Sequence, residues 1–324
     1  MSKRRNWVAW WLAAGVVAGT TQVALRYQAW KRKALARLKA GAQIADTAAG
    51  PIEYATIGEG PAVLVLHGSP GGYDQGLAFA RIAGPEGYRY IAPSRPGYLG
   101  TSITVGATPA GQADACAALL DSLEVPRATV IGISGGGPAA LQFALRHADR
   151  CAGLVMACAV ARRWLSTDQS AGNQMMDQVF MSDPAVWAFT RLVAAQGKRL
   201  ASLFADDFPE FPSHIAPDPE KLGLFLDFMD TLAPASPRRA GFENDYVEFG
   251  SLPLYPLERV AAPTLVLHGT RDHSVAFADA EFVAHAVPGA ELHAVQGGDH
   301  VFFIAHKHEV REVLMAFLGR CAGS

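Results

Sequence analysis

Short apolar runs alternate with longer amphipathic stretches between residues 50 and 320. The runs are seven to nine residues long and nearly free of polar positions, as in a parallel sheet covered on both faces. They occupy residues 62–68, 88–94, 128–134, 152–160, 263–269 and 291–298, and residues 51–58 alternate as an edge strand does. The stretches between them predict helices over 74–83, 108–124, 137–149, 276–287 and 307–319. This order predicts a doubly wound, mostly parallel α/β sheet.

One interval interrupts the alternation. About a hundred residues between the runs 152–160 and 263–269 contain no convincing strand and are rich in Phe, Trp, Met and Pro, which is too long for a connection. We predict an inserted helical element over residues 161–258, with the α/β core formed by residues 41–160 and 259–324. Its large apolar residues either line a pocket or form its own core: Trp164, Met175, Met176, Phe180, Met181, Trp187, Phe189, Phe204, Phe225, Phe228 and Met229.

The first 40 residues differ in character from the rest. Residues 7–25 contain no charge, close to the ~20 residues that cross a bilayer as a helix, and three tryptophans lie at one end. We predict an N-terminal membrane-spanning helix and a basic juxtamembrane segment within residues 1–40. A cleaved signal peptide, implying export, and a buried helix are the alternatives. The basic residues between Arg26 and Lys39 oppose export and place the rest of this single-pass protein in the cytoplasm.

The charge and the cysteine content of the chain limit the kinds of ligand and partner that it can bind. Residues 1–40 hold nine of the 28 Lys and Arg residues and no acid, so the remainder carries 19 basic against 30 acidic residues, a net charge of −11. An acidic body argues against a nucleic-acid partner. The four cysteines are scattered and predict free thiols rather than a metal site or disulfides. We expect a small-molecule substrate, with no metal and no cofactor; the sequence predicts no oligomeric state.

Glycines surround Ser134, where the run 128–134 ends and the helix predicted over 137–149 begins. Glycine weakens both strands and helices, so the backbone must need it here. The pattern is G-x-S-x-G, the nucleophile elbow, in which a sharp strand-to-helix turn exposes the serine hydroxyl. Gly132 and Gly136 leave room for the turn. We predict that Ser134 is a nucleophile.

A serine nucleophile needs a base to take its proton and an acid to orient that base. Among the ten histidines, His300 lies in a glycine-containing loop after the last apolar run, and Asp272 lies just past the run 263–269. Ligands collect at such strand ends in open α/β sheets. We predict His300 as the general base and Asp272 as the orienting acid. Asp299, beside His300, is expected only to shape the loop.

A second glycine-rich bend follows the run 62–68 and supplies a candidate oxyanion hole. We assign the backbone N–H groups of Ser69 and Gly135 as its two donors. The residues that shape the bend are His67, Gly68 and Pro70. A phosphate-binding loop is excluded, because no Lys-Ser/Thr pair follows the glycines and G-x-G-x-x-G is absent from the sequence.

From about residue 50 to residue 320, the chain resembles enzymes of the α/β-hydrolase fold that carry an H-G-x-P oxyanion loop and an inserted helical cap. The motifs stand in the order Ser, Asp, His that is typical of the family: residues 67–71, residues 132–136 around Ser134, residues 269–275 with Asp272, and Asp299-His300. Two positions depart from many relatives. Ser94 stands where an Asp opens the R-P-G-Y-x-G turn, and Gly135 replaces a large residue.

The resemblance implies a serine hydrolase that forms an acyl-enzyme. With the apolar cap, we predict a carboxylic ester, lipophilic in character, as the substrate. Epoxide and halide chemistry are disfavoured, because such relatives use an aspartate in place of Ser134. A carbon–carbon bond hydrolase, an aminopeptidase-like amide hydrolase and a catalytically silent, membrane-tethered binding protein are the open alternatives.

Overall fold

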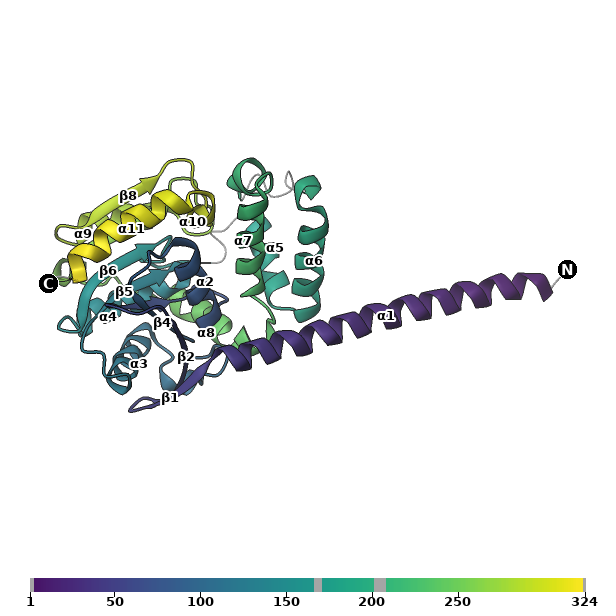
Figure 1. Ribbon diagram of the computed structural model, residues 1–324, viewed down its shortest axis with the longest axis horizontal. Helices are drawn as coiled ribbons and strands as arrows, with labels where there is room; N and C mark the ends of the chain where they lie inside the picture. Colours follow the sequence, from purple (N-terminus) through teal and green to yellow (C-terminus); the bar gives the residue numbers. More distant parts are fainter. Residues whose placement is uncertain (1–2, 166–170, 201–207, 323–324) are drawn as a thin grey trace. The chain divides into compact units, whose positions relative to one another are not determined.

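The computed structural model describes residues 3–165, 171–200 and 208–322, and within these an eight-stranded sheet forms the centre of the compact unit of residues 41–324 (Figure 1). The strand order is β1-β2-β4-β3-β5-β6-β7-β8. β2 pairs antiparallel with β1 and β4, and the pairs from β4 to β8 are parallel. The bounds are β1 Gln43–Thr47, β2 Gly50–Ile57, β3 Ala62–Leu66, β4 Arg89–Pro93, β5 Ala128–Ile133, β6 Cys151–Ala157, β7 Thr264–Gly269 and β8 Glu291–Val295.

Helices cover both faces of the sheet, so alternate side chains of its central strands are buried on opposite sides. On β3, Val63 and Val65 pack with residues of α2 and α11, whereas Leu64 and Leu66 pack with residues of α3 and α4. Burial on both faces explains the near-continuous apolar runs. The predicted mostly parallel α/β sheet is confirmed. Its helices are α2 Tyr73–Ala83, α3 Pro109–Ser122, α4 Gly137–Arg146, α9 Phe277–Ala286, α10 Phe302–Ala305 and α11 Lys307–Ala322.

The apolar pattern does not predict β1 or the short helix α10. β1 has the sequence QIADT, is largely exposed, and pairs with β2 at the edge of the sheet. Its turn is closed locally, since Thr47 Oγ1 donates to the Gly50 carbonyl oxygen at 2.7 Å. An exposed edge strand that buries few side chains leaves little periodic signal in the sequence.

Within the described residues, four α-helices lie between β6 and β7: α5 Ala171–Phe180, α6 Asp183–Leu200, α7 Pro219–Asp230 and α8 Arg239–Gly250. We call residues 161–258 the cap. Figure 1 shows α5, α6 and α7 side by side, with α8 apart from them and nearer the sheet. Asp218 begins α7 as its N-cap, and its side chain accepts from the backbone N–H groups of Glu220 and Lys221.

The described residues of the unit 1–40 form, with Gly41, one 39-residue helix, α1 Lys3–Gly41. Among the residues that the structure describes, no helix combines the length and the apolar character that a membrane span requires. The membrane-spanning helix predicted over residues 7–25 therefore has no support from the described residues and stays a prediction.

We expect the stability of the fold to depend on the side chains that the helices bury against either face of the sheet. Leu154 on β6 is 0% exposed, and Leu254 is 76% exposed. Leu154→Ala should lower the free energy of unfolding by about 2–5 kcal/mol, because it leaves a cavity in the core. Leu254→Ala should change it by less than about 0.5 kcal/mol. Urea unfolding followed by circular dichroism compares the two; equal losses would contradict this account of the core.

Candidate active site

Ser134 stands at a sharp turn between β5, which ends at Ile133, and α4, which begins at Gly137. Its φ of 48° lies in the left-handed region, which a non-glycine residue adopts only under constraint. A Cβ at Gly132 would lie 2.7 Å from that of Ala140, and one at Gly136 would lie 2.3 Å from the Leu66 carbonyl oxygen. Both positions therefore need glycine for the turn to form.

The structure brings together Ser134, His300 and Asp272, although 166 positions separate the serine from the histidine. His300 Nε2 lies 3.1 Å from Ser134 Oγ, and His300 Nδ1 lies 2.7 Å from Asp272 Oδ2. Asp272 Oδ1 accepts from the backbone N–H groups of Ser274 and Val275, at 2.8 and 2.9 Å. A carboxylate fixed in this way favours a proton on His300 Nδ1, which leaves Nε2 free to accept from the serine hydroxyl.

Asp272 and His300 each favour the charged form of the other. Burial alone would raise the pKa of Asp272, but the charge of His300 and hydrogen bonds from His268 and His300 outweigh it and hold the pKa well below its usual range. Burial opposes the charge of His300, yet Asp272 raises the pKa of the imidazole above its ordinary 6.5. His268 was not predicted as a site residue; its Nε2 lies 3.1 Å from Asp272 Oδ2.

Asp299 is fully buried and does more than shape a loop. Its carboxylate accepts from the backbone N–H groups of Val301 and of the cap residue Glu210, each at 3.0 Å. Glu210 Oε2 accepts from the Asp299 backbone N–H in return, also at 3.0 Å. Burial, reinforced by the charge of Glu210, raises the pKa of Asp299 to about 7. The cap thus holds the loop that carries His300.

Hydrogen bonds fix the candidate oxyanion loop after β3. The Gly68 N–H donates to Gln75 Oε1 at 2.7 Å, and Gln75 Nε2 donates to the Pro70 carbonyl oxygen at 3.3 Å. His67 Nε2 accepts from the Arg95 N–H at 2.9 Å, which leaves Nδ1–H to donate to the Gly68 carbonyl oxygen at 2.7 Å. Burial and the charge of Arg95 lower the pKa of His67, so a neutral ring braces the loop.

The side chain of Ser69 explains the glycine that follows Ser134. A Cβ at Gly135 would lie 2.2 Å from Ser69 Oγ and 3.1 Å from the ring of Phe249. Ser69 therefore occupies the space that a larger residue at position 135 would need. Ser69, Ser134 and Gly135 line one cavity, as the assignment of their backbone N–H groups to an oxyanion hole requires.

Comparison with known proteins identifies the family. The family described as alpha/beta hydrolase fold matches residues 61–307, a range that includes Ser134, Asp272 and His300. The chain belongs to this family. This α/β hydrolase is similar to a solved alpha/beta hydrolase fold protein from Nakamurella multipartita, with 36% identity, 87% of this chain and 100% of that chain covered, and a TM-score of 0.78.

Two curated relatives are also hydrolytic enzymes by name. An uncharacterized hydrolase, YcgS, from Bacillus subtilis (strain 168) is 25% identical over 83% of this chain and 95% of its own length. A poly(3-hydroxyalkanoate) depolymerase from Ectopseudomonas oleovorans is 29% identical over 64% of this chain and 66% of its own length. Fold and relatives together show that the chain is a hydrolase.

The α/β hydrolase departs from many relatives at Ser94, and the structure shows what replaces the missing aspartate. Ser94 Oγ donates to Glu53 Oε2 at 2.6 Å, and the same oxygen accepts from the Gly100 N–H at 3.1 Å. Glu53 lies on the neighbouring strand β2, which pairs with β4. A carboxylate from another strand therefore holds the turn that contains Arg95.

A cavity of about 160 Å³ opens onto Ser134, and its lining is mostly apolar. Of the cap residues predicted either to line a pocket or to form the cap's core, those that line the cavity are Trp164, Phe180, Phe189, Phe225, Phe228 and Met229. Phe204 and the side chain of Met176 lie outside the described residues. The cap thus contributes both a core and the wall of the cavity.

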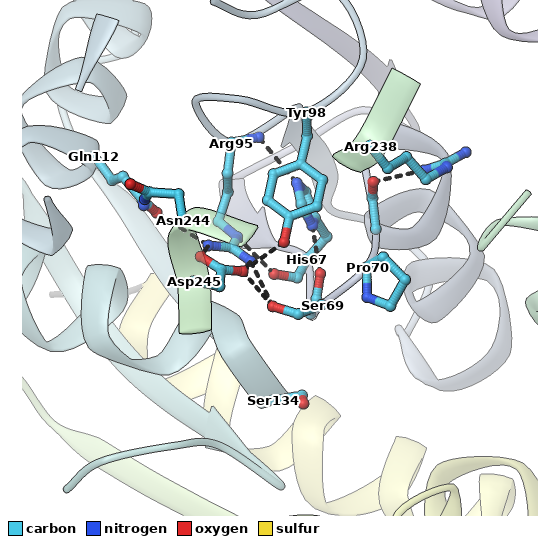
Figure 2. Close-up of polar contacts among 12 residues, drawn as sticks. His67, Ser69, Pro70, Arg95, Tyr98, Gln112, Ser134, Arg238, Asn244 and Asp245 are labelled. Atoms are coloured by element: carbon cyan, nitrogen blue, oxygen red, sulfur yellow. Dashed lines mark hydrogen bonds and ion pairs between the residues drawn. The ribbon is translucent and has the colours of Figure 1, made fainter. Parts of the chain in front are cut away.

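The sequence analysis missed a polar cluster beside Ser69, shown in Figure 2. Asp245 of α8 pairs with Arg95 at 2.6 Å, and Tyr98 Oη donates to the same carboxylate at 2.5 Å. Arg95 stands in the R-P-G-Y turn that the motif comparison singled out. Asp245 had no such signal, because an aspartate in an amphipathic helix ordinarily faces solvent.

The hydrolase should lose activity in acid. As the pH falls, the imidazole of His300 gains a proton and can no longer act as a base. Because Asp272 raises the pKa of His300, kcat/KM should reach half of its maximum at a pH above 6.5. Asp272→Asn removes the charge, so the midpoint should move down and the rate should drop by about 10³–10⁴-fold. Rate profiles from pH 5 to 9 measure both effects; an unchanged midpoint in the variant would contradict the coupling.

The contact between Ser69 and Gly135 predicts a non-additive pair of substitutions. Gly135→Ala should reduce kcat by more than about 100-fold, because its Cβ collides with Ser69 Oγ beside the nucleophile. Adding Ser69→Ala removes the colliding atom, so the double variant should be more active than Gly135→Ala alone. Steady-state kinetics of the four proteins tests this. A double variant no better than Gly135→Ala would show that Ser69 Oγ is not the obstacle.

Proposed function

We propose that this α/β hydrolase cleaves carboxylic esters through an acyl-enzyme formed on Ser134. The observation that carries the proposal is the chain of hydrogen bonds from Ser134 through His300 to Asp272, with Ser69 and Gly135 in the same cavity. Each part has a role only if a carbonyl group is attacked beside Ser134.

In the proposed reaction, His300 Nε2 takes the proton of Ser134 Oγ as the hydroxyl attacks the ester carbonyl. The backbone N–H groups of Ser69 and Gly135 stabilise the oxyanion that forms. His300 then gives the proton to the leaving alcohol, and an acyl-enzyme remains. A water molecule, deprotonated by His300, attacks the acyl carbon and releases the acid, which restores the serine. Asp272 stabilises the imidazolium in both steps.

The lining of the cavity favours an ester with an apolar acyl group. Phe228 of the cap and Phe303 of the core have ring centroids 5.1 Å apart, and within the cap the ring centroids of Phe211 and Phe225 are 4.9 Å apart. Such a wall gains free energy by burying hydrocarbon and offers little to a charged group. The relative named poly(3-hydroxyalkanoate) depolymerase supports an alkanoate-type ester.

Asp245 does not serve the aminopeptidase-like alternative, which Asp177, the other cap aspartate that lines the cavity, leaves open. An aminopeptidase needs a carboxylate that can bind the substrate amine, and Asp245 already accepts hydrogen bonds from Arg95, Tyr98 and Ser69. The aligned serine, histidine and aspartate count against a silent binding protein. A carbon–carbon bond hydrolase uses the same three residues and is separated from an esterase by substrate alone.

A fluorophosphonate probe and a panel of p-nitrophenyl esters from acetate to octanoate test the proposal. The wild-type protein should be labelled once and should show a burst of nitrophenol, with kcat/KM rising with acyl length as apolar surface is buried. Ser134→Ala, the matched control, should show neither label nor turnover. Absence of label in the wild type would overturn the serine mechanism. Label without ester turnover, but with cleavage of a hydroxy-oxo-dienoate, would favour the carbon–carbon alternative.

A further inference from the structure

Asp245 belongs to the cap but is buried against the core. It lies on α8, is 1% exposed, and receives four hydrogen bonds (Figure 2). Arg95 Nη1 donates to Oδ1 at 2.9 Å and Nη2 donates to Oδ2 at 2.6 Å. Tyr98 Oη donates to Oδ2 at 2.5 Å, and Ser69 Oγ donates to the same oxygen. This carboxylate is fully occupied by the protein and has no capacity left for a substrate.

Arg95 connects Asp245 to the candidate oxyanion loop. Its Nε donates to the His67 carbonyl oxygen at 2.9 Å, and its Nη2 donates to Ser69 Oγ at 3.1 Å. The Ser69 hydroxyl thus donates to Asp245 and accepts from Arg95, which fixes the direction of its proton and occupies one of its lone pairs. The two residues on either side of Gly68 are therefore held by one ion pair from the cap and the core.

Burial and neighbouring charges fix the protonation states of Arg95 and Tyr98. Burial opposes the charge of Arg95, but Asp245 outweighs it and raises the pKa of the guanidinium above its ordinary value. Burial and the charge of Asp245 raise the pKa of Tyr98, so its hydroxyl stays protonated and donates. A buried pair with every donor used is costly to break, because one charge would be left without a partner.

A second cap residue holds the other end of the loop. Arg238 is 0% exposed; its Nη1 donates to the Gly71 carbonyl oxygen at 2.6 Å. The same guanidinium binds both carboxylate oxygens of Asp74, at 3.1 and 2.8 Å. The loop from Ser69 to Gly71 is thus attached to the cap at both ends.

We propose that the cap residue Asp245 positions the oxyanion hole, by holding Ser69 directly and through Arg95. The inference rests on the proposed function, since it requires the Ser69 N–H to stabilise an oxyanion. That stabilisation depends on a donor placed 2.7–3.1 Å from the developing charge. Loss of the tether lets the Ser69 backbone move, which weakens binding of the transition state and leaves binding of the apolar acyl group unchanged.

Two variants of the full-length protein separate positioning from folding. Ser69→Ala removes the tether and leaves the pair between Asp245 and Arg95 intact; Asp245→Asn removes the charge and keeps the shape. Each should lower kcat for p-nitrophenyl butyrate by about tenfold, a fraction of the loss when an oxyanion donor is removed. KM should change by less than about twofold, because the apolar wall is untouched. Fluorophosphonate titration corrects each rate for the fraction of active protein.

A boronic acid that forms a tetrahedral adduct with Ser134 provides the second measurement. Its inhibition constant should rise by the same factor by which kcat falls in both variants, since the adduct places an oxygen in the oxyanion hole. Asp279→Asn is the matched control. Asp279 is also a buried cap-contacting carboxylate, bound by the Ala161 and Arg162 N–H groups at 3.0 Å and by Arg162 Nη2 at 3.1 Å, but it does not line the cavity. Asp279→Asn should lower the free energy of unfolding without weakening the binding of the boronic acid.

The outcomes distinguish this inference from the proposed function. If wild-type protein hydrolyses esters and both variants keep wild-type kcat and boronate affinity, positioning by Asp245 is overturned. A parallel loss of kcat and boronate affinity in Asp279→Asn would overturn it too, since a general loss of packing would then suffice. If wild-type protein hydrolyses no ester, but boronate affinity falls in Ser69→Ala, the ester assignment fails and the positioning stands.

Discussion

The left-handed backbone at Ser134 is the constraint on which the site depends. A turn this sharp forces α4 to start against the ends of β3 and β5, so that the Leu66 carbonyl oxygen lies where a side chain at Gly136 would be. The same closeness brings the loop after β3 over the serine. Strain at Ser134 and the proximity of the loop after β3 are therefore one feature of the backbone, stabilised by the parallel sheet behind it.

Much of the fold could be predicted because a sheet covered on both faces demands runs of apolar residues, and these are visible in the chain. Ser134, Asp272 and His300 could be named because each follows such a run in a short glycine-containing motif. Asp245 and Glu210 could not be named, because neither of these two residues lies in a motif. Their partners, Arg95 and Asp299, are 150 and 89 positions away in the sequence. The edge strand β1 was missed because it buries too little.

The turn at Ser94 shows the limit of a comparison by sequence position. Many relatives have an aspartate at this position, and here Glu53 on the neighbouring strand supplies the carboxylate. Local sequence is a good guide to backbone requirements and a poor one to which side chain meets them.

The ties between cap and core have a consequence for how such enzymes diversify. Asp245 of α8 binds Arg95 and the Ser69 hydroxyl, and Arg238, just before α8, binds Asp74 and the Gly71 carbonyl oxygen, so this cap is not an interchangeable module. Replacing it with the cap of another hydrolase would leave Arg95 as a charge buried without a partner. New substrate ranges would arise more readily from changes in α5 to α7, where aromatic residues line the cavity and can be exchanged without touching the machinery.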